Sequence, residues 1–318
     1  MRAVRYHAYG GIERLALEDA PRPEAGRRQA RVRVVRAALN PKDALFRKGR
    51  FRALSGGAFP KTPGLDFAGL VLDDPTGRHP AGARVFGVLD EWRCTRGTLA
   101  EEVVVSPREL ARLPTRVSFD EAAAAPLVGL TALQALRDVA RLEPGQRLLV
   151  NGASGGLGTM AIQVGRRLGA HVTTISSAKN REFCTDLGAD EALAYDLPAP
   201  ERRAHAPFDV VLDAFGNLPL AEARGQLGAR GVWVGAIPSP RLLLRDLATR
   251  GAAIEERLVI VRPRASDLDT LASWLVDGSI RAVIDRTYAL ADVAEAFAHL
   301  ESKRARGKLV VVVSEGGA

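Results

Sequence analysis

The sequence has few cysteines, few aromatic residues and no long apolar run. Its 318 residues include two cysteines, Cys94 and Cys184, which can form neither a CxxC pair nor a disulfide framework. No apolar run approaches the ~20 residues needed to cross a bilayer. The N-terminus is too densely charged to resemble a signal peptide. We therefore expect a protein of the reducing cytoplasm with no membrane partner.

Lysine is scarce compared with arginine, and the positive charge is dispersed. The formal net charge is +8, but the arginines are scattered along the chain. No basic helix with interleaved aromatic residues and no known nucleic-acid motif occurs, so we expect no nucleic-acid partner. The five histidines are also scattered and show no metal-ligand spacing.

The length and composition predict roughly two domains of about 150 residues each. Residues 1–118 read as β-rich, because residues 31–36 alternate basic and apolar side chains and many prolines and glycines separate short segments. The pattern changes near Ser118, which forms a capping box with Glu121. Helices are predicted over 119–125 and 129–139.

Strands then alternate with helical segments. Apolar segments at 147–150, 171–175, 192–195, 208–212, 232–235 and 258–261 predict strands, and residues 157–168 show helical spacing. Such alternation is typical of an α/β fold with a parallel sheet covered on both faces. Beyond it we expect helices at 270–276 and 292–300 and a final strand at 308–313.

A glycine-rich loop, Asn151–Gly158, joins a predicted strand to a predicted helix. A pyrophosphate must approach the backbone amides of such a helix closely, where side chains would block it. Gly155 permits this approach, and Gly158 lets the helix pack against the strand. The pattern is A-x-G-x-x-G, with Ala153 first. The predicted dinucleotide contacts are Ser154, Gly155, Gly156, Leu157 and Gly158; the alternative is a merely tight turn.

The end of the second strand of this unit indicates which dinucleotide binds. An NAD site places Asp or Glu there, and a carboxylate ~4 Å from a 2′-phosphate would repel it by about 4 kcal/mol. This sequence has hydroxyls and cations instead, among them Ser176 and Lys179. We therefore predict NADP(H). The alternative is that Lys179 and Arg181 are solvated residues at the start of a helix.

Several segments together resemble the medium-chain dehydrogenase/reductase superfamily, and most of all its zinc-independent quinone oxidoreductase branch. They are residues 38–43, 63–69, 97–101, 129–132 and the glycine-rich loop, in the order of the family. The resemblance implies a GroES-like β-rich catalytic domain built from both chain ends, with a Rossmann domain between them. The expected bounds are 1–118 and 262–318 for the catalytic domain and 119–261 for the Rossmann domain.

The residues that match metal ligands of zinc-dependent relatives are Asn40, Leu65 and Leu127. Two leucines cannot ligate zinc, and two cysteines cannot form the four-cysteine structural site of those relatives. We therefore expect no metal. Without a Lewis acid, an easier hydride acceptor is expected, such as a quinone or an α,β-unsaturated carbonyl.

The resemblance implies that Asn40 and Thr131 line the nicotinamide and substrate cleft. Asp43 lies one helical turn from Asn40 and would orient it or hold a water molecule. The alternatives are a turn residue before Pro41 for Asn40 and a helix cap for Asp43. Trp92 lies in a loop that would form a substrate-side wall, or would simply pack.

The resemblance also extends the cofactor site. It implies that Tyr195 lies near the 2′-phosphate and that Lys308 lies near the cofactor phosphates. Phe215 and Gly216 follow the fourth strand, and Ala236 and Ile237 follow the fifth, near the nicotinamide. Asn217 departs from the family pattern, in which many relatives have glycine.

The sequence thus predicts an NADPH-dependent, zinc-independent oxidoreductase that transfers hydride to a quinone or an α,β-unsaturated carbonyl. One alternative is an enoyl-thioester reductase whose Arg47, Lys48, Arg50 and Arg52 face a phosphopantetheine or CoA tail; these residues are otherwise a solvated loop. Another is an NADPH-binding protein without turnover. The apolar edge strand at Leu258–Val261 predicts a homodimer.

Overall fold

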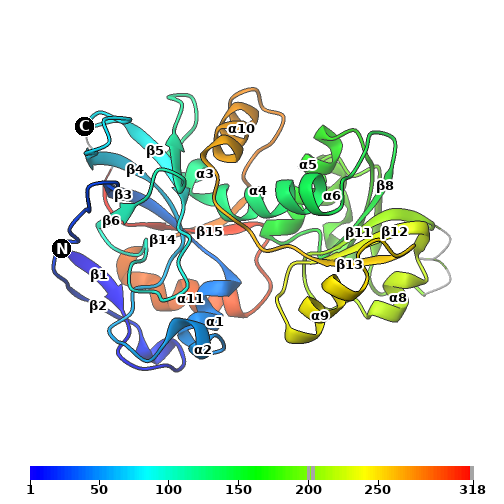
Figure 1. The fold of residues 1–318 in the computed structure, drawn as a ribbon, viewed down its shortest axis with the longest axis horizontal. Coiled ribbons are helices and arrows are strands. Elements are labelled where there is room, and N and C mark those ends of the chain that lie inside the picture. The colour runs from blue at the N-terminus through cyan, green and yellow to red at the C-terminus, as the bar shows by residue number, and fades with distance from the viewer. Residues whose placement is uncertain (199–200, 202–204, 316–318) are drawn as a thin grey trace. The chain divides into compact units, whose positions relative to one another are not determined.

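The computed structural model describes residues 1–198, 201 and 205–315, which form two compact units (Figure 1). The terminal unit comprises Met1–Leu127 together with Arg262–Ala318, and the central unit comprises Val128–Val261. None of the helices in these described ranges is long and apolar enough to span a membrane.

The terminal unit is built around a mixed sheet in the order β14-β15-β3-β4-β5-β7, with β6 paired to β3; β1 and β2 form a separate ribbon. Its strands are β1 (Arg2–Arg5), β2 (Ala16–Asp19), β3 (Ala30–Leu39), β4 (Asp66–Asp73), β5 (Arg84–Val88), β6 (Glu102–Val105), β7 (Leu110–Arg112), β14 (Ile284–Ala289) and β15 (Lys308–Val312). Its helices are η1 (Ile12–Arg14), α1 (Pro41–Arg47), α2 (Arg52–Ser55), α3 (Phe119–Ala124), α10 (Ala265–Val276), η4 (Leu290–Asp292) and α11 (Val293–Glu301). Helix α3, which we predicted to open the Rossmann domain, packs on β3 and β4.

Strand β3 lies in the middle of the sheet although its sequence contains several arginines. Val32 and Val34 are buried while Arg31 and Arg33 are half-buried, as the alternating pattern predicts. The register against β4 shifts between Val34 and Arg36, so the phase of the alternation changes there. The second half of the strand is therefore buried on both faces, apart from the half-buried Arg36.

The central unit contains a parallel sheet in the order β10-β9-β8-β11-β12-β13. Its strands are β8 (Arg147–Asn151), β9 (His171–Ser176), β10 (Glu191–Ala194), β11 (Phe208–Asp213), β12 (Leu227–Gly235) and β13 (Glu255–Leu258). Its helices are η2 (Gln134–Val139), α5 (Gly156–Arg167), η3 (Ala178–Asn180), α6 (Arg181–Asp186), α8 (Leu220–Arg224) and α9 (Pro240–Ala248); α4 (Pro126–Leu133) crosses the boundary between the units.

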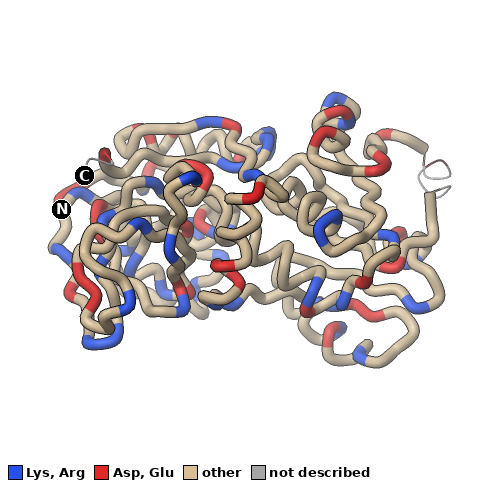
Figure 2. The backbone as a smooth tube through the Cα atoms, turned by 90° about the horizontal axis from the view of Figure 1, so that it is seen from above, with Lys and Arg blue, Asp and Glu red and all other residues tan. Residues whose placement is uncertain are grey.

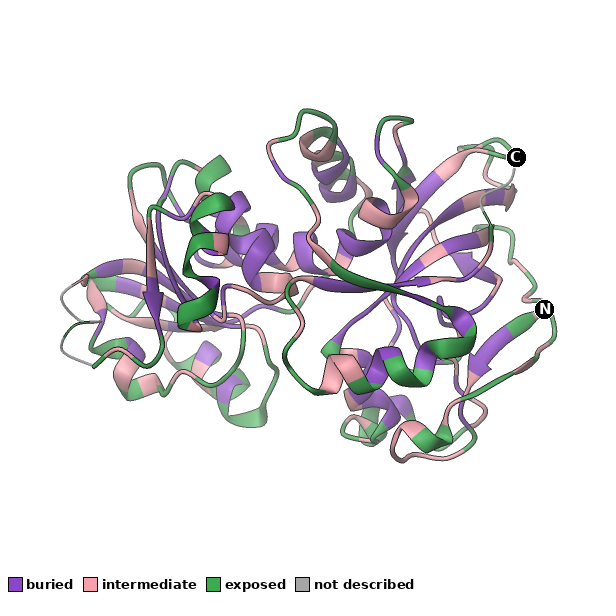
Figure 3. Ribbon diagram, turned by 180° about the vertical axis from the view of Figure 1, so that it is seen from behind, coloured by how far each residue is buried: buried purple, intermediate pink, exposed green. Residues whose placement is uncertain are grey.

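The central sheet is Rossmann-like and confirms the predicted α/β fold. Its inner strands are buried on both faces, as in Val210, Val211 and Leu212 (Figure 3). The strand order reverses between β8 and β11. Ligands of doubly wound sheets bind at the carboxyl ends of the strands at such a reversal.

The last strand of this sheet lies earlier in the sequence than predicted. We expected Leu258–Val261, but β13 is Glu255–Leu258. The Glu256 carboxylate is fully buried and accepts hydrogen bonds from Arg224 and Arg245, which makes a charged segment acceptable in a sheet. Since β13 is an edge strand, dimerisation through this edge stays a prediction.

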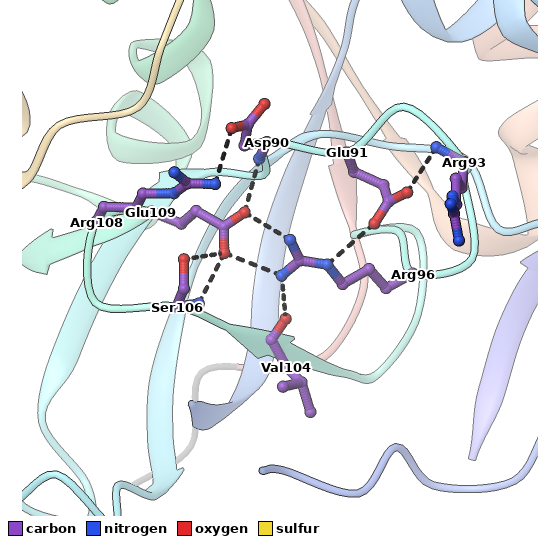
Figure 4. A network of polar contacts seen from close by, with 8 residues as sticks. All are labelled: Asp90, Glu91, Arg93, Arg96, Val104, Ser106, Arg108 and Glu109. Atoms are coloured by element: carbon purple, nitrogen blue, oxygen red, sulfur yellow. Dashed lines mark hydrogen bonds and ion pairs between the residues drawn. The ribbon is translucent and has the colours of Figure 1, made fainter. Parts of the chain in front are cut away.

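Charges of both signs are interspersed on each unit (Figure 2), and many arginines are in ion pairs. A buried network holds the loop that follows β5 (Figure 4). The fully buried Glu109 carboxylate accepts from two nitrogens of Arg96, at 2.9 and 2.6 Å, and from the Asp90 amide at 2.7 Å. Arg96 also donates to Glu91 at 3.1 Å. The loop that carries Trp92 is therefore fixed at both ends.

We predict that Glu109→Gln lowers the free energy of unfolding by about 3 kcal/mol near neutral pH, because Arg96 would lose its fully buried counter-charge and keep only its pair with Glu91. Burial by itself raises the pKa of Glu109, but the hydrogen bonds and charge of Arg96 outweigh it and hold the pKa below the ordinary 4.5. This stabilisation is therefore present above that value and is lost as the pH falls below it.

Urea unfolding at neutral and acidic pH measures both effects. The control is Glu101→Gln, which breaks an exposed pair with Arg2 and should cost under about 1 kcal/mol. Equal losses in the two variants would contradict the assignment.

Candidate functional site

The register of three strands brings Asn40, Asp66 and Lys308 together. Strand β15 runs antiparallel to β3 with Leu309 opposite Leu39, and β4 runs antiparallel to β3 with Asp66 opposite Ala38. The residue after β3 is Asn40, and the residue before Leu309 is Lys308. Residues far apart in sequence thus meet at one end of the terminal sheet.

These three residues form a buried polar cluster, which we call the Asn40–Asp66–Lys308 cluster. The Lys308 Nζ donates to Asn40 Oδ1 at 2.5 Å and to Asp66 Oδ2 at 2.8 Å. The Asn40 Nδ2 donates to Asp66 Oδ2 at 2.9 Å, and the Leu127 amide donates to Asp66 Oδ1 at 2.7 Å. Asn40, Asp66 and Lys308 are at most 4% exposed. The amide of Asn40 is therefore held in one orientation.

The structure gives the Lys308 ammonium two buried partners, because Lys308 begins the buried strand β15. The contact of Lys308 with the cofactor phosphates, which the resemblance implies, stays a prediction. Sequence reasoning missed Asp66 as a site residue. The available signal was a carboxylate within the otherwise apolar segment 65–68.

Asp43 acts as the helix cap that we considered as its alternative role. Its Oδ2 accepts from the Asn40 amide at 2.8 Å at the start of α1. Asp43 is 2% exposed. Burial raises the pKa of its carboxyl to about 7; the Asn40 amide opposes this shift, and the charge of Asp66 adds to it. The group is therefore poised to gain or lose a proton near neutral pH.

The central unit presents the glycine-rich loop at the carboxyl end of β8. Asn151, the last residue of β8, donates from Nδ2 to Asp213 Oδ1 at 2.8 Å and to Asn217 Oδ1 at 2.9 Å. The loops after β8 and β11 are thereby joined where the strand order reverses. Asn217, which departs from the family pattern, has a structural role here.

The glycines of this loop fit a bound dinucleotide. Gly155 is the N-cap of α5 and provides no side-chain cap, and the first intrahelical bond runs from the Thr159 amide to the Gly155 carbonyl. A Cβ on Gly158 would lie 2.4 Å from the Gly152 carbonyl oxygen, so Gly158 is needed for packing. A Cβ on Gly155 would meet its nearest atom at 3.7 Å. The space beside Gly155 is thus open, at the end of α5 where the first backbone amides have no partner inside the helix.

Ser176 and Tyr195 are neighbours at the ends of adjacent strands. The Tyr195 amide donates to the Ser176 carbonyl at 2.8 Å, and the Tyr195 side chain is 63% exposed. Ser176 is buried, while Lys179 is exposed and lines a surface hollow together with Arg181 and Thr185. Arg181 donates to the Ala192 carbonyl at 2.8 Å.

The nicotinamide end of the predicted site has apolar side chains. Phe215 and Ile237 are 43% and 46% exposed at the carboxyl ends of β11 and β12, and a Cβ on Gly216 would lie 2.3 Å from Ile237 Cδ1. Ala236 is half-buried beside them. Thr131 is half-buried on α4 in the central unit.

We predict that Asp43→Asn becomes more stable relative to the wild type as the pH rises, because the wild type loses stability. The pKa of Asp43 is raised from 3.8 to about 7, so the stabilisation tied to its proton is present below 3.8 and lost as the pH rises to 7. The difference in unfolding free energy between variant and wild type should grow by up to about 4 kcal/mol from about pH 4 to pH 8. Urea unfolding measures it; the exposed control Asp269→Asn should show no such trend.

We predict opposite outcomes for two alanine substitutions in the glycine-rich loop. Gly158→Ala should lower the melting temperature, because its Cβ collides with backbone. Gly155→Ala should leave the melting temperature within a few degrees but weaken dinucleotide binding by at least about tenfold, because the methyl group occupies the pyrophosphate space. Calorimetric titration with NADPH measures binding. Unchanged affinity in Gly155→Ala would contradict this placement.

Comparison with known families agrees with the geometry. Residues 26–115 match the alcohol dehydrogenase GroES-like domain, and residues 187–311 match the zinc-binding dehydrogenase domain. Despite the second description, no group of three or more His, Cys, Asp and Glu side chains that could hold a metal ion is found within residues 1–198, 201 and 205–315.

Relatives align over nearly the whole chain. The trans-enoyl reductase pgmF of Aspergillus terreus is 33% identical over 93% of this chain and 91% of its own length. The chloroplast envelope quinone oxidoreductase homolog of Arabidopsis thaliana is 31% identical over 98% of each chain. The structure of the quinone oxidoreductase from Coxiella burnetii superposes with a TM-score of 0.91 at 27% identity over 99% of each chain. The chain belongs to the medium-chain dehydrogenase/reductase superfamily of oxidoreductases, among relatives of the quinone oxidoreductase type.

Proposed function

We propose that this oxidoreductase uses NADPH to reduce quinones or α,β-unsaturated carbonyls without a zinc ion. The observation that carries the proposal is the Asn40–Asp66–Lys308 cluster. The residues that match metal ligands are Asn40, Leu65 and Leu127. The Lys308 ammonium lies 2.5 Å from the Asn40 side-chain oxygen. A divalent ion beside that buried ammonium would be strongly repelled.

A reaction without a metal favours an acceptor that delocalises the negative charge it receives. Quinones and α,β-unsaturated carbonyls accept hydride at an atom conjugated to oxygen. The protein then needs to align the reactants and polarise that oxygen. Asn40, Asp43 and Thr131 remain our proposals for the residues around the reacting groups.

The dinucleotide, when bound, supplies the hydride from its nicotinamide. In our proposal, Ser154 and the amides of Gly156, Leu157 and Gly158 bind its pyrophosphate. Ser176, Lys179 and Tyr195 bind the 2′-phosphate, and the residues after β11 and β12 line the nicotinamide. No carboxylate follows β9 at Ser177 or Ala178 to repel a 2′-phosphate, which supports NADPH over NADH.

An enoyl thioester is the second candidate acceptor, and the trans-enoyl reductase among the relatives favours it. Of the four basic residues that we considered for its CoA or carrier tail, two form bonds within the terminal unit. The Arg47 guanidinium is fully buried against Glu301 and the Gly10 carbonyl, and Lys48 pairs with Glu301 at 2.5 Å. Arg50 and Arg52 are exposed and would be the residues to meet such a tail.

We predict that the protein oxidises NADPH faster than NADH with a benzoquinone, a conjugated enal or crotonyl-CoA. Lys179→Ala should reduce the preference for NADPH by about five- to tenfold, because one cation beside the 2′-phosphate is lost. The measurement is kcat/KM for both dinucleotides, from the loss of their absorbance. The matched control is Arg167→Ala, which removes an exposed cation from the C-terminal end of α5, away from the glycine-rich loop. It should leave the preference for NADPH unchanged.

Equal or better rates with NADH would refute the cofactor assignment. Binding of NADPH with no turnover of any acceptor class would refute the enzymatic proposal and favour a binding protein.

A further inference from the structure

Lys42 is a half-buried lysine whose ammonium lies on an aromatic ring. Its Nζ is 3.9 Å from the centroid of the Trp92 ring and 5.4 Å from that of Phe46. Phe46, Phe51 and Trp92 pack together with centroid separations of 5.2 to 6.0 Å. Trp92 itself stands on the loop that the network in Figure 4 holds in place.

The ammonium of Lys42 has no hydrogen-bond acceptor within the described residues. Its contacts there are the two aromatic rings, and solvent reaches its nitrogen. Other lysines in this unit are bonded. Lys61 donates to the carbonyls of Ser55 and Arg93, both at 2.7 Å, and Lys308 donates within its cluster. Lys42 therefore has N–H donors available to a ligand.

A purely structural side chain at this position would not need a charge. Lys42 lies in the first turn of α1, the end of a helix at which positive charge is least favourable. An uncharged side chain of similar length would cover Trp92 without the cost of desolvating an ammonium. The Trp92 ring and nearby carboxylates offset part of this cost, but no hydrogen bond does, which is typical of a residue kept for function.

The surroundings of Lys42 make its proton easier to release. Burial lowers the pKa of the ammonium. The charged and titratable groups that face it oppose this shift; they are Asp43 on α1 and Asp90, Glu91 and Cys94 on the loop after β5. Burial outweighs them, so the side chain lies closer to the balance between its charged and neutral forms than an exposed lysine does.

We propose that Lys42 is the catalytic acid of the proposed reaction, and that its ammonium hydrogen-bonds the acceptor's carbonyl oxygen beside the Trp92 ring. This inference rests on the proposed function. Lys42 would supply the electrophile that an enzyme without a metal lacks, and it would donate the proton. The neighbouring polar residues are less suited. The Asn40 side chain is held by Asp66 and Lys308, and the Asp43 carboxyl is bound to a backbone amide.

The step balances for an α,β-unsaturated carbonyl. Hydride, with its electron pair, leaves the reduced nicotinamide dinucleotide and forms a C–H bond at the β-carbon. The electron pair of the C=C bond moves to the α-carbon–carbonyl bond, and the C=O π pair moves to oxygen. An N–H bond of Lys42 breaks, its proton forms the O–H bond of an enol, and neutral Lys42 regains a proton from water. The acceptor gains two electrons and the dinucleotide loses two.

Two substitutions and a matched control test the proposal. Lys42→Met keeps an apolar stem over Trp92 but has no N–H, and should lower kcat/KM by about 100- to 1,000-fold with NADPH affinity unchanged. Lys42→Arg keeps the charge but cannot release its proton, so it should retain acceptor binding better than turnover. Lys303→Met removes an exposed lysine that belongs to none of the proposed sites and should keep wild-type turnover.

The pH dependence gives a second measurement. The wild-type rate should fall as the pH rises through the lowered pKa of Lys42, because the acid form is lost, and this fall should be absent in Lys42→Met. The same pKa can be measured without turnover. The chain has six lysines, so NMR of the ¹³Cε/¹⁵Nζ-labelled, cofactor-free protein should show a resonance that titrates below the ordinary ~10.4 and disappears in Lys42→Met.

Wild-type turnover in Lys42→Met would overturn the inference and leave the proposed function intact. A slow Lys42→Met whose pH profile still matches that of the wild type would also overturn it, because Lys42 would then act only through structure. If the wild type turns over no acceptor, the proposed function fails and the inference fails with it.

Discussion

The terminal unit depends on the ammonium of Lys308, at which three segments of the chain meet. It holds the residue after β3 and the first residue of β4 from its own place at the start of β15. Removing one partner of such a buried pair typically costs about 3–5 kcal/mol, because the remaining charge stays desolvated. Asp66 also accepts from the Leu127 amide, so the same interaction fixes the chain just before it enters the central unit. The orientation of Asn40 follows from these bonds.

The two units use different parts of the polypeptide for their proposed tasks. For the pyrophosphate, the central unit offers backbone: a glycine loop, a helix N-terminus and two joined loops at the reversal of strand order. The terminal unit offers side chains whose charges are adjusted by burial. Asp43 is held near the midpoint of its titration, and Lys42 is displaced toward its neutral form. Backbone amides suit an invariant pyrophosphate, whereas chemistry on an acceptor needs groups that can gain and release protons.

The preference for arginine gives the few lysines of the terminal unit particular meaning. Arginine remains charged in any protein environment and serves the ion pairs of the surface and of the Glu109 network. Lys61 binds two backbone carbonyls, Lys308 binds a carboxylate and an amide, and Lys42 lies on an aromatic ring. Each has a compact ammonium that arginine could not replace without changing the geometry of its bonds.

The sequence by itself determined the features that arise from local patterns. The glycine-rich loop, the alternation of β3 and the strand–helix rhythm each require only neighbouring residues, and the family resemblance places them in one fold. Tertiary structure alone decided the partners of charged residues. Lys308 meets Asn40 through strand register, Arg47 is buried against Glu301, and the charged β13 enters the sheet because Arg224 and Arg245 neutralise Glu256. The residues next to a charged side chain in the sequence do not reveal its partner, because that partner lies on a segment that only folding brings close.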